Sequence, residues 1–351
     1  MKTCAVAASC VDFPFRRLLL VSTAQTDKSR TRIILGITMR IQLDAKDLID
    51  VVEHGRPMSV AEFGCLLRER SASVAVGNVS VLQFVAPLVR ANEFSRMRAL
   101  LQGLETLPLT YIASDRIPQL EINEALVAFR EGREPVRLEP FGTRWDDTFY
   151  WPRAPRTRML INIRLDQFVE SVFTEDPRIL EMRSSIAEFR AGFAVFRSLP
   201  DVRLTDAWLR KDFGETIWRK IVYLRSNGMW DLPIGRDEAV EAGYWMYDDP
   251  ARCSGLRLQH ECYFELMKNK NDVPKDDDLA DFIYVGTIPY VDFTTLDRRM
   301  LHYVCSGAKR LASKGNRARF DKQIFRNLAE LIENVWNVRS SESSVADQPV
   351  G

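Results

Sequence analysis

The chain has little histidine, no closely paired cysteines and no long apolar run. Its three histidines and six scattered cysteines include no Cys-x-x-Cys pair, so neither a zinc site nor a disulfide framework is expected. No stretch of about eighteen apolar residues is present, which argues against a membrane-spanning helix. Free thiols at such spacings are typical of the reducing cytoplasm, and we therefore expect a cytoplasmic protein.

Net charge of either sign is also lacking. The 49 Lys and Arg residues almost balance the 48 Asp and Glu residues, which leaves a formal net charge of +1. A nucleic-acid surface would have to be a local patch, because the molecule as a whole is not a polyelectrolyte. The 351 residues suffice for roughly two domains, or for one domain with a large insertion.

Alternation between strand and helix patterns predicts an α/β fold. Residues 41–43 alternate as a strand, and the chain changes at Asp44 to the period of a helix. A second strand is expected within residues 73–82, and residues 291–296 are the strongest strand candidate near the C-terminus. We therefore predict a central parallel sheet that is flanked by helices.

The predicted core is discontinuous. Residues 39–90 and 255–336 carry the strand patterns, whereas residues 91–254 are mainly helical in pattern. We interpret this middle segment as an insertion that covers the sheet, selects substrate or forms a homo-oligomer contact. Residues 1–38 begin like a signal peptide, but charged residues and a proline interrupt the apolar part, so we expect a non-structural leader or an upstream start. Residues 337–351 are expected to be a flexible polar tail.

Acids stand where predicted strands become helices. Asp44 follows the first predicted strand, and Asp297 follows the last. In an open parallel sheet the carboxyl ends of the strands line one edge, and ligands gather there. We expect Asp44 and Asp297 to meet at that edge. Asp281 and Asp278, which precede the last strand, are expected to join them.

Converging carboxylates repel one another unless a cation lies between them. Oxygen ligands without spare His or Cys suit Mg²⁺ or Mn²⁺. An ion held by aspartates can orient and deprotonate water for attack on phosphorus, which predicts phosphodiester hydrolysis. The alternative is structural, because an Asp after a strand is often a helix N-cap, and Asp44 and Asp297 both suit that role. Asp292 alternates with apolar residues in its strand and is expected to face away from the site.

Three segments resemble those of PIN-domain-like nucleases. They are IQLDAKDLID at 41–50, SVAVGNVSVLQFVAPL at 73–88 and DFIYVGTIPYVDFTTLDRRM at 281–300. The resemblance implies a PIN-like sheet, a Mg²⁺ or Mn²⁺ cofactor and RNA as the substrate. It puts Asp44, Asp281 and Asp297 on the family's acidic positions, and Thr295 on its hydroxyl position.

One acidic position of the family is not matched. The family usually has a Glu in the helix after the second strand, where this chain has Gln83, whose amide brings no charge. Glu121, Glu124 or Glu261 replaces it from elsewhere, or else the metal site is weakened. We predict Asp278 and Glu261 as assisting metal ligands. The alternative for Glu261 is an exposed acid on an amphipathic helix.

Basic residues cluster in two regions and suit a nucleic-acid substrate. One cluster follows the last acid, and the other interleaves arginines with aromatic rings within residues 133–158. Basic groups beside stacking surfaces are typical of sites for single-stranded RNA or DNA. The alternative is a solvated helix face and a packed loop. The predicted substrate-binding residues are Thr295, Arg298, Arg299, Lys309, Arg310 and Arg144.

These patterns together favour a metal-dependent endoribonuclease with Asp44, Asp281 and Asp297 as its catalytic acids. The amide at Gln83 favours an alternative, a catalytically weak PIN-like scaffold that binds RNA or a protein partner. A third hypothesis is an unrelated α/β interaction domain whose acids are only helix caps.

Overall fold

The computed structural model describes most of the chain between Met39 and Trp336. The described residues are 39–148, 164–167, 169–170, 194, 205–226, 230, 232–275, 278–313 and 323–336. The predicted leader and the predicted tail lie outside these ranges. So do residues 149–158 of the aromatic basic cluster and residues 314–322 of the cluster after the last acid.

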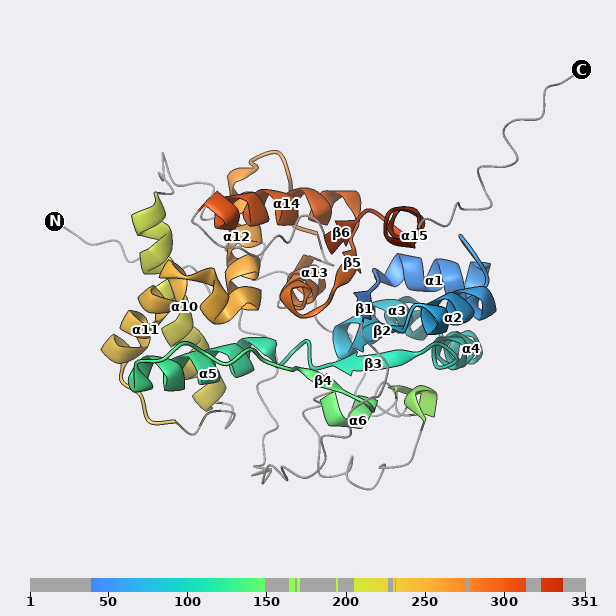
Figure 1. Ribbon diagram of the computed structural model, residues 1–351, viewed down its shortest axis with the longest axis horizontal. Helices are drawn as coiled ribbons and strands as arrows, with labels where there is room; N and C mark the ends of the chain where they lie inside the picture. The colour runs from blue at the N-terminus through green and yellow to red at the C-terminus, as the bar shows by residue number, and fades with distance from the viewer. Residues whose placement is uncertain are drawn as a thin grey trace, which may run out of the picture.

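Six strands of the described chain form one sheet in the order β4-β3-β2-β1-β5-β6. Neighbouring strands are parallel, except that β4 runs antiparallel to β3. The strands are β1 (Met39–Gln42), β2 (Ala72–Gly77), β3 (Leu109–Ile112), β4 (Phe141–Gly142), β5 (Phe293–Thr295) and β6 (Ile324–Phe325). This mostly parallel sheet with its helices confirms the predicted α/β class (Figure 1).

Two groups of helices divide the core (Figure 1). The group around β1 and β2 consists of α1 (Ala45–His54), α2 (Val60–Glu69), α3 (Asn78–Arg90), α4 (Phe94–Leu104) and α15 (Leu328–Trp336), with the short α6 (Trp145–Thr148) nearby. The second group consists of α5 (Ile117–Glu131), α10 (Asp206–Ser226), α11 (Arg236–Asp248), α12 (Ser254–Lys268), α13 (Asp278–Val285) and α14 (Arg298–Ser313), with the 3₁₀ turns η3 (Pro250–Cys253) and η4 (Ile288–Tyr290).

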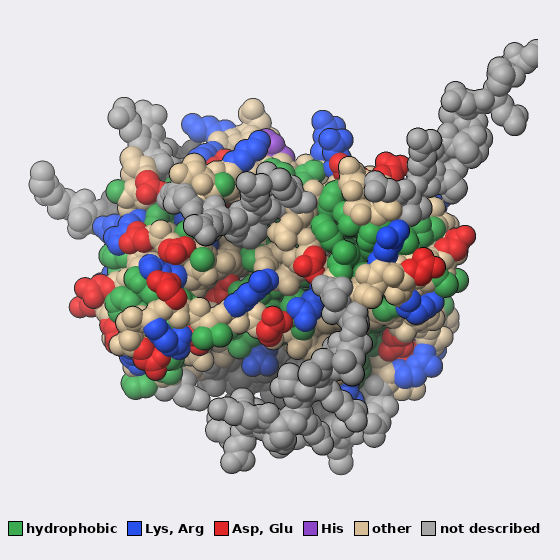
Figure 2. Space-filling view, in the orientation of Figure 1, with side chains coloured by type: hydrophobic (Ala, Val, Ile, Leu, Met, Phe, Trp, Pro, Cys, Tyr) green, Lys and Arg blue, Asp and Glu red, His purple; other side chains and the backbone are tan. Residues whose placement is uncertain are grey.

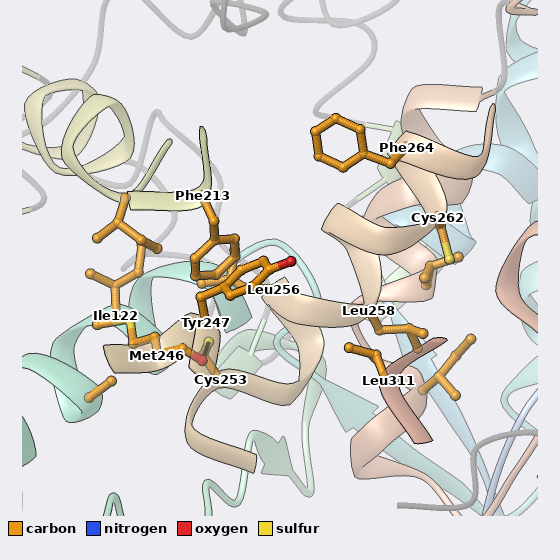
Figure 3. Packing of buried hydrophobic residues seen from close by; sticks show 14 of the residues in the cluster. Ile122, Phe213, Met246, Tyr247, Cys253, Leu256, Leu258, Cys262, Phe264 and Leu311 are labelled. Atoms are coloured by element: carbon orange, nitrogen blue, oxygen red, sulfur yellow. Dashed lines mark hydrogen bonds between the residues drawn. The ribbon is translucent and has the colours of Figure 1, made fainter. Parts of the chain in front are cut away.

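The second group is a packed helical body. In Figure 3 the rings of Phe213 and Tyr247 lie against each other, with centroids 5.9 Å apart. Leu258 of α12 and Leu311 of α14 point toward each other and are fully buried. Burial of such side chains contributes roughly 1.5–3 kcal/mol each before the entropy cost of ordering them. This packing ties α14, which starts at the site, to the helical body.

The carboxyl ends of β1 and β5 lie side by side, which positions the site. Ile41 stands opposite Phe293, and Gln42 stands opposite Thr294. After β1, the Asp44 side chain accepts the N–H of Lys46 at 2.9 Å and so caps the start of α1. The predicted cap at this position is confirmed.

The strand boundaries differ from the sequence prediction in two places. β3 and β4 lie within residues 91–254, so part of the predicted helical insertion belongs to the sheet. β3 is only four residues long, and such a short run has no clear period; its pairing with β2 makes it a strand. The strand predicted over residues 73–82 ends at Gly77, because α3 begins at Asn78.

The four cysteines in the described ranges carry free thiols. Burial raises the pKa of the Cys253 and Cys262 thiols well above the ordinary value, so neither is a ready nucleophile. None of the helices that the structure describes has the length and apolar character needed to cross a membrane.

Candidate functional site

A small pocket opens at the carboxyl ends of β1 and β5. The chain brings Asp44, Asp281 and Asp297 together there from the start of α1, the first turn of α13 and the residue before α14. The residues that line the pocket are Asp44, Gln83, Asp281, Tyr284, Leu296, Asp297 and Met300. Three acids from distant segments therefore share one concave surface at the sheet edge where ligands gather in α/β folds.

Each of the three carboxylates is held by an N–H donor through one oxygen. Lys46 donates its backbone N–H to Asp44 at 2.9 Å, and the amide of Gln83 donates to Asp281 at 2.9 Å. Asp297 accepts a backbone N–H from the first turn of α14 at 2.7 Å, so it also caps a helix. The second oxygens of Asp281 and Asp297 receive no hydrogen bond from the residues that the structure describes.

Burial without a cation raises the pKa of two of these acids. The pKa of Asp281 is raised to about 7, mainly by desolvation and in addition by the charges of Asp297 and Asp44, against the opposing hydrogen bond from Gln83. Desolvation also raises the pKa of Asp44, to which the charge of Asp297 adds. The three carboxylates are therefore close enough to repel one another.

The donor set partly fits a hard divalent cation. Carboxylate oxygens are the ligands that Mg²⁺ and Mn²⁺ prefer, and the pocket offers three acids without His or Cys. Within the described ranges, however, no three acidic, histidine or cysteine side chains stand close enough to hold an ion as they are oriented. Ion binding at this pocket would therefore require a change in the orientation of these side chains.

Asp278 was predicted to assist the site but is bound elsewhere. Its side chain is 1% exposed, and Arg299 donates to both of its oxygens. The N–H of Lys275 adds a further hydrogen bond at 2.7 Å. Arg299 also binds Asp272 at 2.7 Å, so the predicted substrate-binding role of this arginine conflicts with a saturated guanidinium. Asp278 does not line the pocket.

Glu261 also lies away from the pocket. It is fully buried on α12 rather than exposed, and it sits between Arg257, at 2.9 Å, and Arg310. Burial alone would raise its pKa, but the neighbouring arginine charges outweigh this and lower it. Arg310 is thereby held inside the fold and is not offered to substrate.

The two other candidate replacements for Gln83 have structural roles. Glu121 is buried on α5 and accepts the N–H groups of Gly255 at 2.6 Å and Leu256 at 2.8 Å, which caps α12 from a distant segment. Glu124 binds Arg133 at 2.7 Å. Gln83 itself lines the pocket, so the amide occupies the position where the resemblance implies an acid.

The remaining predicted substrate-binding residues differ in how far their side chains are exposed to solvent. Arg298 and Lys309 are exposed on α14. Arg144 is bound by Asp146 through two hydrogen bonds of 2.8 Å. Thr295 is fully buried and accepts the N–H of Asp44 at 2.9 Å, so it holds the turn beside the pocket and cannot reach a substrate.

Asp47 is a residue near the site that sequence reasoning missed. It is 7% exposed on α1, where its carboxylate interacts with the Thr295 hydroxyl and the N–H of Leu328 at the start of α15. Burial raises the pKa of Asp47 to about 6, and the charge of Asp44 adds to the rise. The signal was its place three residues after Asp44, which puts both acids on one side of a helix.

Asp292 is exposed and accepts the N–H of Arg40 at 2.7 Å beside β1. Asp292 does not line the pocket, so this contact is structural, as the sequence pattern predicts.

Comparison of the chain with protein-family models, with curated proteins and with solved structures found no match. The resemblance of three segments to PIN-domain-like nucleases stays a prediction.

Proposed function

We propose that this protein is a metal-dependent nuclease that hydrolyses phosphodiester bonds in RNA at the pocket of Asp44, Asp281 and Asp297. The observation that supports the proposal is the gathering of three carboxylates from remote segments at the carboxyl edge of a parallel sheet. A bound Mg²⁺ or Mn²⁺ would offset their mutual repulsion and activate the attacking water.

The chain's own residues orient the ligand set. Backbone N–H groups hold one oxygen each of Asp44 and Asp297, which directs those side chains from the ends of β1 and β5. Thr295 fixes the turn at Asp44 through a buried hydrogen bond. Leu296 and Met300 provide apolar walls, which limit water around the acids and strengthen electrostatic interactions there.

The proposal is tested with labelled single-stranded RNA and Mn²⁺, with and without a chelator. Asp44→Asn and Asp297→Asn are the informative variants, because asparagine also caps helices and the local fold is retained. We expect cleavage to fall at least about 100-fold in both, since a lost metal ligand removes several kcal/mol of transition-state stabilisation.

The matched control is Asp237→Asn, which removes an exposed acid from the first turn of α11. Its cleavage rate is expected to equal that of the wild type. Equal rates from the wild type and both pocket variants, or cleavage that persists in the chelator, would reject the nuclease.

One observation favours a second candidate, a catalytically weak scaffold that binds RNA or a protein partner. Gln83 supplies an amide where a fourth carboxylate would add charge, and its N–H occupies an oxygen of Asp281. Calorimetry separates the two proposals. Retained RNA binding with no heat of Mn²⁺ binding at millimolar concentration supports the scaffold, whereas saturable Mn²⁺ binding that Asp297→Asn removes supports the nuclease.

A further inference from the structure

Helix α14 starts beside the pocket and contains basic residues but no acid. Its sixteen residues, RRMLHYVCSGAKRLAS, contain four Lys or Arg residues and one His. These five side chains fall into two sets whose directions differ by roughly 90° around the helix axis. The difference between the sets indicates which of them can meet a ligand.

The first set faces the protein and is neutralised. Arg299 binds Asp272 and Asp278, and Arg310 binds Glu261. Both guanidinium groups form ion pairs with buried acids. Neither can move to a ligand without leaving a buried charge unpaired.

The second set consists of Arg298, His302 and Lys309, which we call the α14 stripe. All three residues are exposed. No ion pair or hydrogen bond connects the side chains of Arg298 and Lys309 to another residue in the part of the chain that the structure describes. The cationic groups of the stripe are thus exposed to solvent rather than bound to acids.

Helix geometry aligns the α14 stripe. At about 100° per residue, His302 is turned roughly 40° and Lys309 roughly 20° from Arg298 around the axis. With a rise of about 1.5 Å per residue, the stripe runs roughly 16 Å along the helix. The three side chains therefore form one narrow line, long enough to meet several successive phosphates of a nucleic-acid strand.

The stripe starts at the pocket. Arg298 directly follows Asp297, which lines the pocket, and Lys309 lies three turns further along. In Figure 2, Lys, Arg and His side chains lie along the upper edge of the molecule with some acids between them, where Figure 1 draws α14 and the loop after α12. A linear ligand that ends or passes at the acids can follow the stripe without crossing an acid of α14.

We propose that the α14 stripe binds the sugar–phosphate backbone of a single-stranded nucleic acid whose reacting phosphodiester lies at the acidic pocket. This inference rests on the proposed function. Arg298 and Lys309 contact phosphates, and the imidazole of His302 meets a phosphate or a base between them. A duplex is not favoured, because a single line of exposed side chains follows one strand.

The test measures binding of a fluorescently labelled single-stranded RNA in EDTA by anisotropy. Arg298→Glu with Lys309→Glu is expected to weaken binding at least about tenfold, because two attractions become repulsions. The matched control is Arg70→Glu with Arg90→Glu, which makes the same change of charge at exposed arginines of the α2 and α3 ends. That control is expected to stay within about twofold of the wild type.

A second measurement tests the backbone contact directly. For Arg298→Gln with Lys309→Gln, the slope of log K against log salt is expected to fall by about 1.4, since each contact to a single strand contributes about 0.7. Thermal unfolding midpoints of all variants are compared first, and exposed substitutions are expected to leave them unchanged. An unchanged slope and affinity in the folded stripe variants would overturn the inference.

The outcomes distinguish this inference from the proposed function. RNA binding that depends on the stripe, together with no Mn²⁺-dependent cleavage, supports the stripe and rejects the nuclease. Normal cleavage with stripe-independent binding rejects the stripe alone. Polyglutamate that displaces RNA at equal charge concentration, through the same two residues, overturns the inference in favour of an acidic polypeptide partner.

Discussion

Two clusters of acids in the described part of the chain differ in the charges that surround them. In the helical body, Glu261 is enclosed between Arg257 and Arg310, and its pKa is lowered. In the pocket, Asp281 faces Asp44 and Asp297, and its pKa is raised to about 7. Glu261 and Asp281 are both desolvated, so the difference between them lies in the charges that the fold places beside them.

That difference separates a structural acid from a candidate functional one. A carboxylate that the fold has already paired gains nothing from an external ion, and removing its partner leaves a buried charge. A group of carboxylates without internal cations costs stability, and such costs are typical of sites that bind a ligand. We therefore propose the pocket, rather than the acids elsewhere in the described chain, as the place for a cation.

The largest change in the free energy of unfolding is expected when Glu261 no longer pairs with Arg257 and Arg310. Glu261→Gln should lower the free energy of unfolding by about 3–5 kcal/mol, because Arg257 is fully buried and keeps its charge. Urea unfolding measures the change. Glu93→Gln is the control, since Glu93 pairs at 3.0 Å with the exposed Arg96 of α4, away from this cluster. The control should lose less than about 1 kcal/mol of unfolding free energy. Equal losses in the two variants would contradict the difference between buried and exposed ion pairs.

In the pocket, removal of a carboxylate should increase stability instead of lowering it. Asp281→Asn should raise the free energy of unfolding by about 2 kcal/mol at pH 8 in EDTA, because a desolvated charge is removed. Folding raises the pKa of Asp281 from 3.8 to about 7, so the acid destabilises the native state increasingly as pH rises through this window and most strongly above it.

The gain from Asp281→Asn should therefore be full above pH 7 and shrink as pH falls toward 4. Urea unfolding across this range measures it, and Asp237→Asn serves as the exposed control. A loss of stability in Asp281→Asn, or a gain that does not depend on pH, would show that repulsion in the pocket is not the dominant effect.

The smallest effect is expected on Mn²⁺ affinity, when a carboxylate is added to the pocket. Gln83→Glu adds a carboxylate beside Asp281 and should raise Mn²⁺ affinity about tenfold, equivalent to about 1.4 kcal/mol, while it lowers stability in EDTA. Gln102→Glu is a closely matched control, because the Gln102 amide donates to Asp166 at the same 2.9 Å outside the pocket. Calorimetric titration with Mn²⁺ compares them, and equal affinities would argue against a cation at this pocket.

Local patterns predicted the parts of this fold that depend on neighbouring residues. The change of period at Asp44 marked the end of a strand and the cap of α1, and the strand before Asp297 is present as β5. For β1, β2, β3 and β5, the parallel order then follows from strands separated by helices. β3 was missed because a run of four residues carries too little periodicity, and only its pairing with β2 reveals it.

The partners of the acids could not be predicted in the same way. Arg299 reaches Asp278 across 21 positions, and Arg310 reaches Glu261 across 49, so no spacing rule connects them. The sequence by itself determined where carboxylates stand relative to strand ends, because that depends on local backbone geometry. Only the tertiary structure decided which carboxylates meet a guanidinium and which meet one another, because charge pairing depends on distances in space.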